Sequence, residues 1–304
     1  MKYAAIDVGT NTVLLLIVEI GKAFEEVLDI ATITRLGEGL KATNRLSEAA
    51  MERTLATLRV YRDTAEKNQA QRIFCVGTAA LREAGNSDVF LSRVRENVGL
   101  PVRVISARDE AYYTYLSVKH DLAWRGGDFL VIDIGGGSTE IIEGTHEGFG
   151  GFVSLPVGSV KLTEMFIRHD PPSPDEIRLV REHIRLLLDL PFAKRGGLLV
   201  GTAGTITTLT SIALGVGEYN KERVHGATLS LETINDVITR LAGLTVAERR
   251  DLPGMEKGRE DILLQGIILL QEVMVHLGVT EVIVNANGVR YGLIYERLDE
   301  RPDS

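Results

Sequence analysis

Short blocks of apolar residues, separated by glycine and polar residues, run along the first third of the chain. Over the first 34 residues this pattern predicts three strands with high β-branched content. A glycine-interrupted loop over 35–46 follows, and Ser47 is placed to cap a helix of about twenty residues. The elements predicted in this half are strands at 2–6, 12–20, 24–34, 72–76 and 101–105 and helices from 47, at about 87–97 and from 106.

The same order of elements then starts again. Three strands are followed once more by alternating helices and strands, although the two halves share little sequence beyond two glycine turns. We therefore predict two α/β domains, 1–124 and 125–304, with the last helix able to pack back on the first domain. The elements predicted in the second half are strands near 128–133, 139–143, 149–155, 197–200 and 281–285 and helices near 158–168, 174–189, 231–242, 245–250, 259–277 and from 288.

The two glycine turns carry the strongest chemical signal. Residues 130–143, LVIDIGGGSTEIIE, and residues 3–17 both read as an apolar strand, Asp-x-Gly, hydroxyl residues and a second apolar strand. Glycine lets the backbone bend and expose its N–H groups, and such groups beside hydroxyls form a concavity that holds phosphate. The acidic residues at the edges of the turn could hold a divalent cation. We predict one phosphate loop in each half, facing each other across a cleft.

Composition and charge narrow the class of protein. The 304 residues are 44% hydrophobic and 25% charged, as in a soluble globular protein, and no apolar run approaches the length that spans a membrane. A single cysteine, Cys75, excludes an internal disulfide and suits a reducing cytoplasm; its apolar surroundings favour a buried thiol over a nucleophile. The net charge of −8 argues against broad DNA binding, so an anionic substrate would need local arginines and a metal ion.

Two charged residues in the first half are candidates for chemistry. Arg82 follows a strand end, where a guanidinium can reach a cleft and grip phosphate, although a solvent-facing helix arginine is the simpler interpretation. Glu110 lies in the first turn of a helix, where the helix dipole alone favours a carboxylate. Ser106 and Asp109 form a capping-box pattern, which makes Asp109 the better candidate for capping and leaves Glu110 available as a candidate general base. A third glycine-hydroxyl turn, 201–209, could seat a phosphate or nucleotide at a helix start.

Several motifs together resemble the exopolyphosphatase/guanosine-pentaphosphatase (Ppx/GppA) family. They are specific in combination, whereas the Asp-x-Gly turns alone would fit any actin-like ATPase or sugar kinase. The resemblance implies two ribonuclease-H-like domains of the actin/hexokinase/heat-shock-protein-70 superfold, with a cleft between them. The motifs, in family order, are AAIDVGTNT (4–12), GTAALREAGN (77–86), ISARDEA (105–111), VIDIGGGSTE (131–140), GTAGTITTL (201–209), EDILLQGIILL (260–270) and NGVRYGL (287–293).

The resemblance also implies roles for the residues in these motifs. Glu110 corresponds to the catalytic base, Arg82 to the arginine that grips phosphate, and Asp133 and Glu140 to a site for Mg²⁺ or Mn²⁺, with K⁺ as a further candidate cofactor. Thr10 and Thr12 stand where the family often has serine, which keeps the hydroxyls. The predicted phosphate-binding residues are Asp7, Gly9, Thr10, Asn11, Thr12, Arg82, Gly135, Gly136, Gly137 and Ser138.

The function implied is release of the terminal phosphate of inorganic polyphosphate or of the 5′ γ-phosphate of guanosine pentaphosphate. The chain resembles the short, two-domain form, which lacks the added helical domains along which a long polyanion would be tracked. Selectivity between the two substrates depends on loops 35–46 and 201–226, and a homodimer is a candidate assembly. Alternatives are an ATP-dependent small-molecule kinase of the same superfold, a non-catalytic alarmone or polyphosphate sensor, and an actin-like filament protein.

Overall fold

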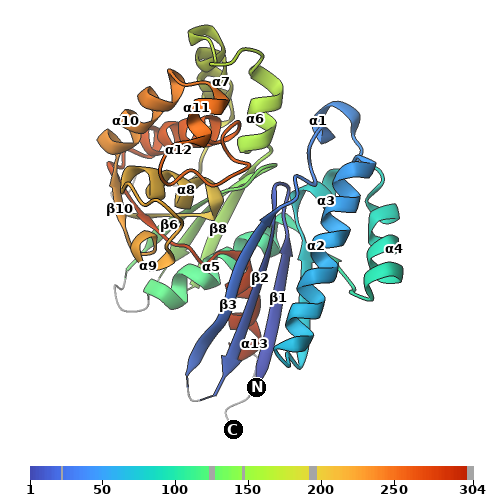
Figure 1. Ribbon diagram of the computed structural model, residues 1–304. Helices are drawn as coiled ribbons and strands as arrows, with labels where there is room; N and C mark the ends of the chain where they lie inside the picture. The colour runs from blue at the N-terminus through green and yellow to red at the C-terminus, as the bar shows by residue number, and fades with distance from the viewer. Residues whose placement is uncertain (22, 123–126, 146–147, 192–196, 300–304) are drawn as a thin grey trace. The chain divides into compact units, whose positions relative to one another are not determined.

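The computed structural model describes residues 1–21, 23–122, 127–145, 148–191 and 197–299 (Figure 1). Contacts between residues divide the chain into two compact units. Unit 1 is Met1–His120 together with the segment that starts at Val289, and unit 2 is Asp121–Gly288. The predicted boundary near residue 124 lies outside the described residues. The sequence pattern predicts a single division point. The contacts give two, after His120 and after Gly288, so that the last helix is part of unit 1.

Unit 1 contains a five-stranded sheet in the order β3-β2-β1-β4-β5. The first three strands form the predicted antiparallel meander, and β4 and β5 join parallel to β1. β-Branched and other apolar residues fill β1 and β2, which suits a pleated surface packed on both faces. The strands are β1 Lys2–Val8, β2 Thr12–Ile20, β3 Phe24–Ile33, β4 Arg72–Gly77 and β5 Arg103–Val104.

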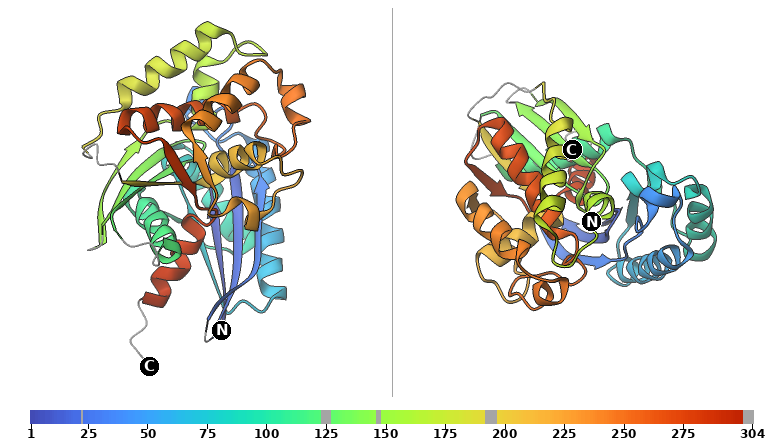
Figure 2. Two further views of the ribbon diagram at one scale, coloured as in Figure 1. Left: turned by 90° about the vertical axis from the view of Figure 1, so that its left-hand side faces the viewer. Right: turned by 90° about the horizontal axis from the view of Figure 1, so that it is seen from above.

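The two faces of this sheet are covered by different helices (Figures 1 and 2). One face packs on α2 and α4 around a buried apolar cluster that includes Ile6, Leu58 and Phe90. On the other face, α13 lies against β1 and β2, and its Arg290 guanidinium binds both carboxylate oxygens of Asp29 in β3 at 2.8 Å. The helices of unit 1 are α1 Leu40–Thr43, α2 Glu48–Lys67, α3 Ala79–Glu83, α4 Ser87–Val98, α5 Ala107–Leu122 and α13 Val289–Asp299.

Unit 2 repeats the plan with one extra strand. Its sheet has the order β10-β11-β9-β6-β7-β8, in which β8, β7 and β6 form the meander and β9 and β11 follow in parallel. Read from the meander, this is the order of the first sheet with β10 added at the far edge. The strands are β6 Phe129–Ile134, β7 Thr139–Thr145, β8 Gly148–Leu155, β9 Leu198–Thr202, β10 Thr228–Ser230 and β11 Glu281–Val284.

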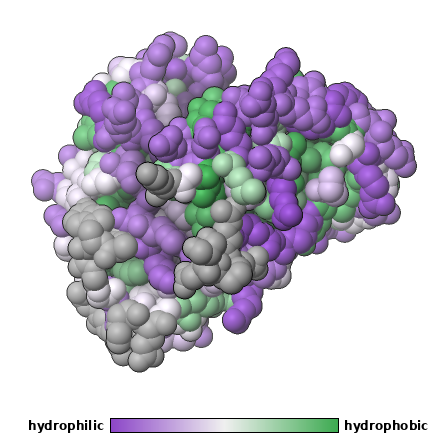
Figure 3. Space-filling model, turned by 90° about the horizontal axis from the view of Figure 1, so that it is seen from below, coloured by the Kyte–Doolittle hydropathy of each residue, from purple (hydrophilic) through white to green (hydrophobic). Residues whose placement is uncertain are grey.

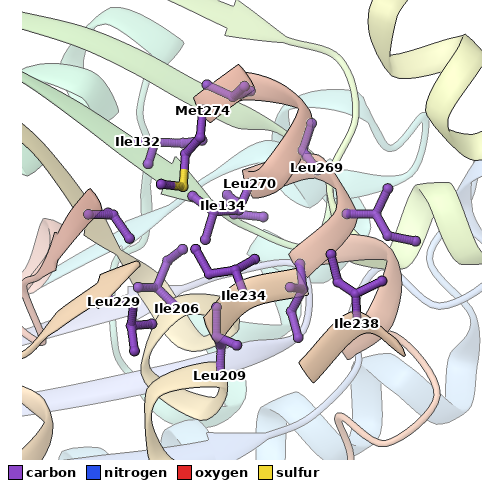
Figure 4. Close-up of a cluster of buried hydrophobic side chains, with 14 of the residues drawn as sticks. Ile132, Ile134, Ile206, Leu209, Leu229, Ile234, Ile238, Leu269, Leu270 and Met274 are labelled. Atoms are coloured by element: carbon purple, nitrogen blue, oxygen red, sulfur yellow. The ribbon is translucent and has the colours of Figure 1, made fainter. Parts of the chain in front are cut away.

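The core of unit 2 lies between one face of the sheet and its helices. Ile132 and Ile134 of β6 point into this core, where they meet side chains such as Ile206, Leu270 and Met274 (Figure 4). Because successive strand residues alternate between faces, Asp133 lies on the opposite face. The helices are α6 Ser159–Phe166, α7 Pro174–Leu187, α8 Ala203–Ala213, α9 Lys221–Val224, α10 Leu231–Ala242, α11 Val246–Arg250 and α12 Leu263–Leu277.

Local predictions from the sequence agree well with the structure. Ser47 caps α2 through the backbone N–H of Ala50, and Ser106 and Asp109 exchange hydrogen bonds at the start of α5. Cys75 is buried, and burial raises the pKa of its thiol well above the ordinary range. The sequence pattern did not predict the short elements α1, α3, α9 and β10, and of the 11-residue α8 it predicted only a helix start in the turn 201–209.

Among the described residues, no helix combines the length and the apolar character needed to cross a membrane. Hydrophilic side chains are spread widely over the face of the molecule in Figure 3, with hydrophobic residues between them in smaller groups.

Candidate functional site

The two predicted phosphate loops share the same backbone hydrogen bond. The Gly9 N–H donates to the carbonyl of Thr12 at 3.0 Å, and the Gly135 N–H donates to the carbonyl of Ser138 at 3.1 Å. In each loop a Cβ added to the glycine would crowd that carbonyl, at 2.9 Å and 3.2 Å respectively. The loops therefore occupy equivalent places, between the first two strands of the meander in each unit.

The first loop is held in place by hydrogen bonds that its backbone carbonyl groups accept. The Thr10 carbonyl accepts from Gly37 N–H at 2.9 Å, and the Asn11 carbonyl accepts from the N–H groups of Thr34 and Arg35. The Asn11 side chain is buried, and neither polar atom of its amide has a hydrogen-bond partner. A buried unsatisfied amide is costly, so this loop is suited to a polar ligand.

The second loop rests on the start of α6. The carbonyl of Gly135 accepts from Ser159 N–H, and the carbonyl of Gly136 accepts from Val160 N–H, each at 3.0 Å. This close approach needs a glycine at position 158, because a Cβ there would come within 2.5 Å of the Gly135 carbonyl oxygen. The start of α6 therefore holds the carbonyls of Gly135 and Gly136 in place.

The two predicted metal ligands are direct neighbours. Asp133 in β6 and Glu140 in β7 are cross-strand partners, so their side chains share one face of the sheet. Asp133 is 8% exposed and Glu140 is 1% exposed, and Ser154 Oγ donates to Glu140 Oε1 at 2.8 Å. Within the described ranges, no cluster of three or more His, Cys, Asp or Glu side chains is suited to a metal ion. Mg²⁺ commonly takes only one or two carboxylates together with water and phosphate oxygens, so this donor set fits it.

Arg82 and Glu110, predicted separately, form an ion pair. Arg82 lies in α3, directly after β4, and Glu110 lies in the first turn of α5. The Arg82 Nη1 donates to Glu110 Oε2 at 2.5 Å and to the carbonyl of Ile105 at 3.2 Å. Glu110 is only 9% exposed, and the Arg82 side chain is 21% exposed. The simpler interpretation of Arg82 as a solvent-facing side chain is therefore wrong.

The third glycine turn leads from β9 into α8. Ala203, the first residue of α8, has a φ of 72°, which is unusual for a residue other than glycine. A Cβ on Gly204 would come within 2.0 Å of Arg259 Nη2, so the Arg259 guanidinium lies directly against the first turn of the helix. Arg259 also binds Glu256. The sequence pattern predicted a phosphate seat here and did not predict the arginine.

The fold and these loops define a class of protein. Each unit has a mixed sheet that begins with a three-stranded meander and carries a glycine-hydroxyl loop after its first strand, which is the actin/hexokinase-like superfold with two sheet domains. The model of the Ppx/GppA phosphatase family matches residues 16–301, and the chain belongs to this family.

Individual relatives are similar over nearly their whole length. Exopolyphosphatase 2 of Mycobacterium tuberculosis is 33% identical over 310 aligned residues, which cover 96% of this chain and 97% of that protein. The crystal structure of the Aquifex aeolicus member of the Ppx/GppA family matches with a TM-score of 0.85 and 33% identity, covering 100% and 99% of the two chains. An exopolyphosphatase structure from Cytophaga hutchinsonii matches with a TM-score of 0.91 and 26% identity, covering 99% of each chain.

Proposed function

We propose that this protein hydrolyses the terminal phosphoanhydride bond of inorganic polyphosphate, of guanosine pentaphosphate, or of both. The observation that carries the proposal is the repeated loop: two glycine-hydroxyl turns with the same hydrogen bond, at equivalent positions of the two sheets. Two loops of this kind suit a substrate with several phosphates in a row. The family and its exopolyphosphatase relatives support the same choice.

In the proposed reaction, Glu110 accepts a proton from a water molecule whose oxygen attacks the terminal phosphorus. The bond from that phosphorus to the bridging oxygen breaks, which releases orthophosphate and a chain shorter by one unit. Arg82 holds the Glu110 carboxylate and binds phosphate with other N–H donors, since a guanidinium carries five.

Asp133 and Glu140 would hold a divalent cation, most simply Mg²⁺. When bound, the cation would offset the negative charge of the substrate phosphates. Thr10, Asn11, Thr12 and Ser138 would contribute hydroxyl, amide and backbone groups to the phosphates. These residues are all nine-tenths or more buried, which strengthens their interactions with an anion.

The proposal is tested by phosphate release from long polyphosphate, tripolyphosphate and guanosine pentaphosphate, each with Mg²⁺ and with a chelator. The variant Glu110→Gln should lower kcat by about a hundredfold or more with little change in KM, because it removes the base and keeps the shape of the side chain. Glu96→Gln, at an exposed position of α4, is the control and should behave as the wild type. Wild-type turnover by Glu110→Gln would refute the role of Glu110, and no phosphate release from any of the three substrates would refute the activity.

A further inference from the structure

The two carboxylates proposed to hold the cation belong to a longer polar row. Across four adjacent strands, Thr202, Asp133, Glu140 and Ser154 are successive cross-strand partners. Cross-strand partners share one face of a sheet, so the four side chains form a line on the face opposite the apolar core. Asp133 and Glu140 are the central pair, and a hydroxyl residue stands on each side of them.

The corresponding row in unit 1 is almost wholly apolar. There the successive partners are Val76, Asp7, Leu14 and Ala31. The aspartate before the glycine turn is the shared member, whereas leucine stands in place of Glu140, alanine in place of Ser154 and valine in place of Thr202. Because both units use the same strand order, the fold itself does not require the polar residues of unit 2. Because these polar residues occur in the sheet of unit 2 and not in the sheet of unit 1, they indicate a chemical purpose.

Both flanking hydroxyls have contacts that suit a cation site. Ser154 Oγ donates to Glu140 Oε1 at 2.8 Å, and this hydrogen bond orients that carboxylate. Thr202 occupies the N-cap position of α8 and makes no capping hydrogen bond. Thr202 is 1% exposed, and its Oγ1 has no hydrogen-bond partner. A buried hydroxyl of this kind beside Asp133 is suited to a water molecule carried by a hydrated cation.

We propose that Ser154 is a positioning residue for a divalent-cation site at Asp133 and Glu140, and that Thr202 completes this site by binding a water ligand of the cation. The inference rests on the proposed function, because it presumes that the acidic pair holds a metal ion. Hydrogen bonds to a metal-binding carboxylate orient it toward the ion, and their loss typically weakens metal binding ten- to a hundredfold.

The test measures binding of Mn²⁺ alone to the metal-free full-length protein, by calorimetry and by the loss of the free-ion electron paramagnetic resonance signal. Ser154→Ala should weaken Mn²⁺ binding about tenfold or more, and Thr202→Val about threefold to tenfold. Ser154→Thr keeps the hydroxyl and should restore most of the affinity. Ala31→Ser places a hydroxyl at the equivalent position of unit 1 and should leave Mn²⁺ binding unchanged.

The controls separate this inference from the proposed function. Asp133→Asn and Glu140→Gln should abolish Mn²⁺ binding; if both variants bind Mn²⁺ as the wild type does, the metal assignment itself fails. If they lose binding while Ser154→Ala retains it, the metal site stands and the role of Ser154 is overturned. Thermal unfolding of each metal-free variant is measured alongside. A drop in Tm for Ser154→Ala with unchanged Mn²⁺ affinity would mean that the serine is only structural.

Discussion

The ion pair between Arg82 and Glu110 joins two residues that carry different parts of the proposed chemistry. A guanidinium is planar and presents several donors in fixed directions, so it can hold a carboxylate with one nitrogen and a phosphate with another. A lysine at this position would keep the positive charge but offer a single point of contact. The pair therefore allows a test that separates charge from geometry.

We expect Arg82→Lys to raise KM for polyphosphate by about tenfold and to lower kcat as well, because Glu110 loses its fixed orientation. Steady-state phosphate release measures both quantities. Arg93→Lys, in a surface ion pair with Glu48, is the matched control and should have little effect. If Arg82→Lys had the same kcat and KM as the wild type, the proposal that Arg82 holds both the Glu110 carboxylate and a phosphate would be wrong.

Glu176 offers a second prediction at the level of a single residue. Burial raises the pKa of its carboxyl, but hydrogen bonds from the backbone of Ser173, from His169 and from the backbone of Arg168 outweigh burial and hold the pKa at about 2. A carboxyl with a lowered pKa stabilises the fold above its unfolded pKa of about 4.5, and this contribution is lost as the pH falls toward 2.

The wild type should therefore be more stable than Glu176→Gln at pH 7, and the difference should shrink between about pH 4.5 and pH 2. Urea unfolding midpoints measured across this range check the prediction. Glu182→Gln, at an exposed position of the same helix, should give a smaller difference at pH 7. If the difference in urea midpoint between the wild type and Glu176→Gln stayed the same at every pH, the lowered pKa of Glu176 would not be its cause.

At the scale of elements, the contact between α5 and α13 depends on one glycine. A Cβ on Gly292 would come within 1.9 Å of the Tyr113 carbonyl oxygen, and a backbone atom cannot move aside as a side-chain end can. The same two helices are joined by a hydrogen bond from Tyr113 to Glu296. Glu110 precedes Tyr113 by one helical turn, so the position of the proposed base depends on this close crossing.

We expect Gly292→Ala to destabilise the protein by about 1–3 kcal/mol through overpacking and to lower kcat by displacing α5. Thermal unfolding and phosphate release are the measurements. Gly21→Ala is the control, because a Cβ there meets nothing within 4 Å and its backbone is not left-handed. If Gly292→Ala matched this control in both stability and activity, the close crossing of α5 and α13 would not determine the position of Glu110.

The elements also explain which features could be predicted from sequence. Strand periodicity, capping boxes and the two glycine loops are local patterns, and they placed Asp7, Asp133 and the meanders correctly. The Arg82–Glu110 pair and the contact of Gly292 with Tyr113 join residues far apart in the chain and leave no periodic signal. Ser154 could have been found only by aligning the third strand of the meander with Glu140. β10 has three residues, too few for an alternating pattern.

At the scale of the whole molecule, the chain passes between its two units twice, at residues 120–121 and 288–289. Within unit 2, side-chain hydrogen bonds connect the residues next to these two points. The Asp121 carboxylate accepts hydrogen bonds from the side-chain amides of Asn285 and Asn287, each at 2.6 Å. Burial raises the pKa of Asp121, against the opposing effects of His225 and of the two amides. The sequence pattern gave no signal for this connection.

The return of α13 to the first sheet sets an order of events during synthesis. A ribosome finishes every residue of unit 2 before it makes the helix that covers the second face of unit 1. Until then Ala5, Leu16 and Val18, fully buried in the finished protein, lack that cover. Domains emerging from the ribosome usually fold in chain order, but here the first unit to begin is the last to be completed. Its early sheet therefore exposes apolar surface that can aggregate until α13 is made.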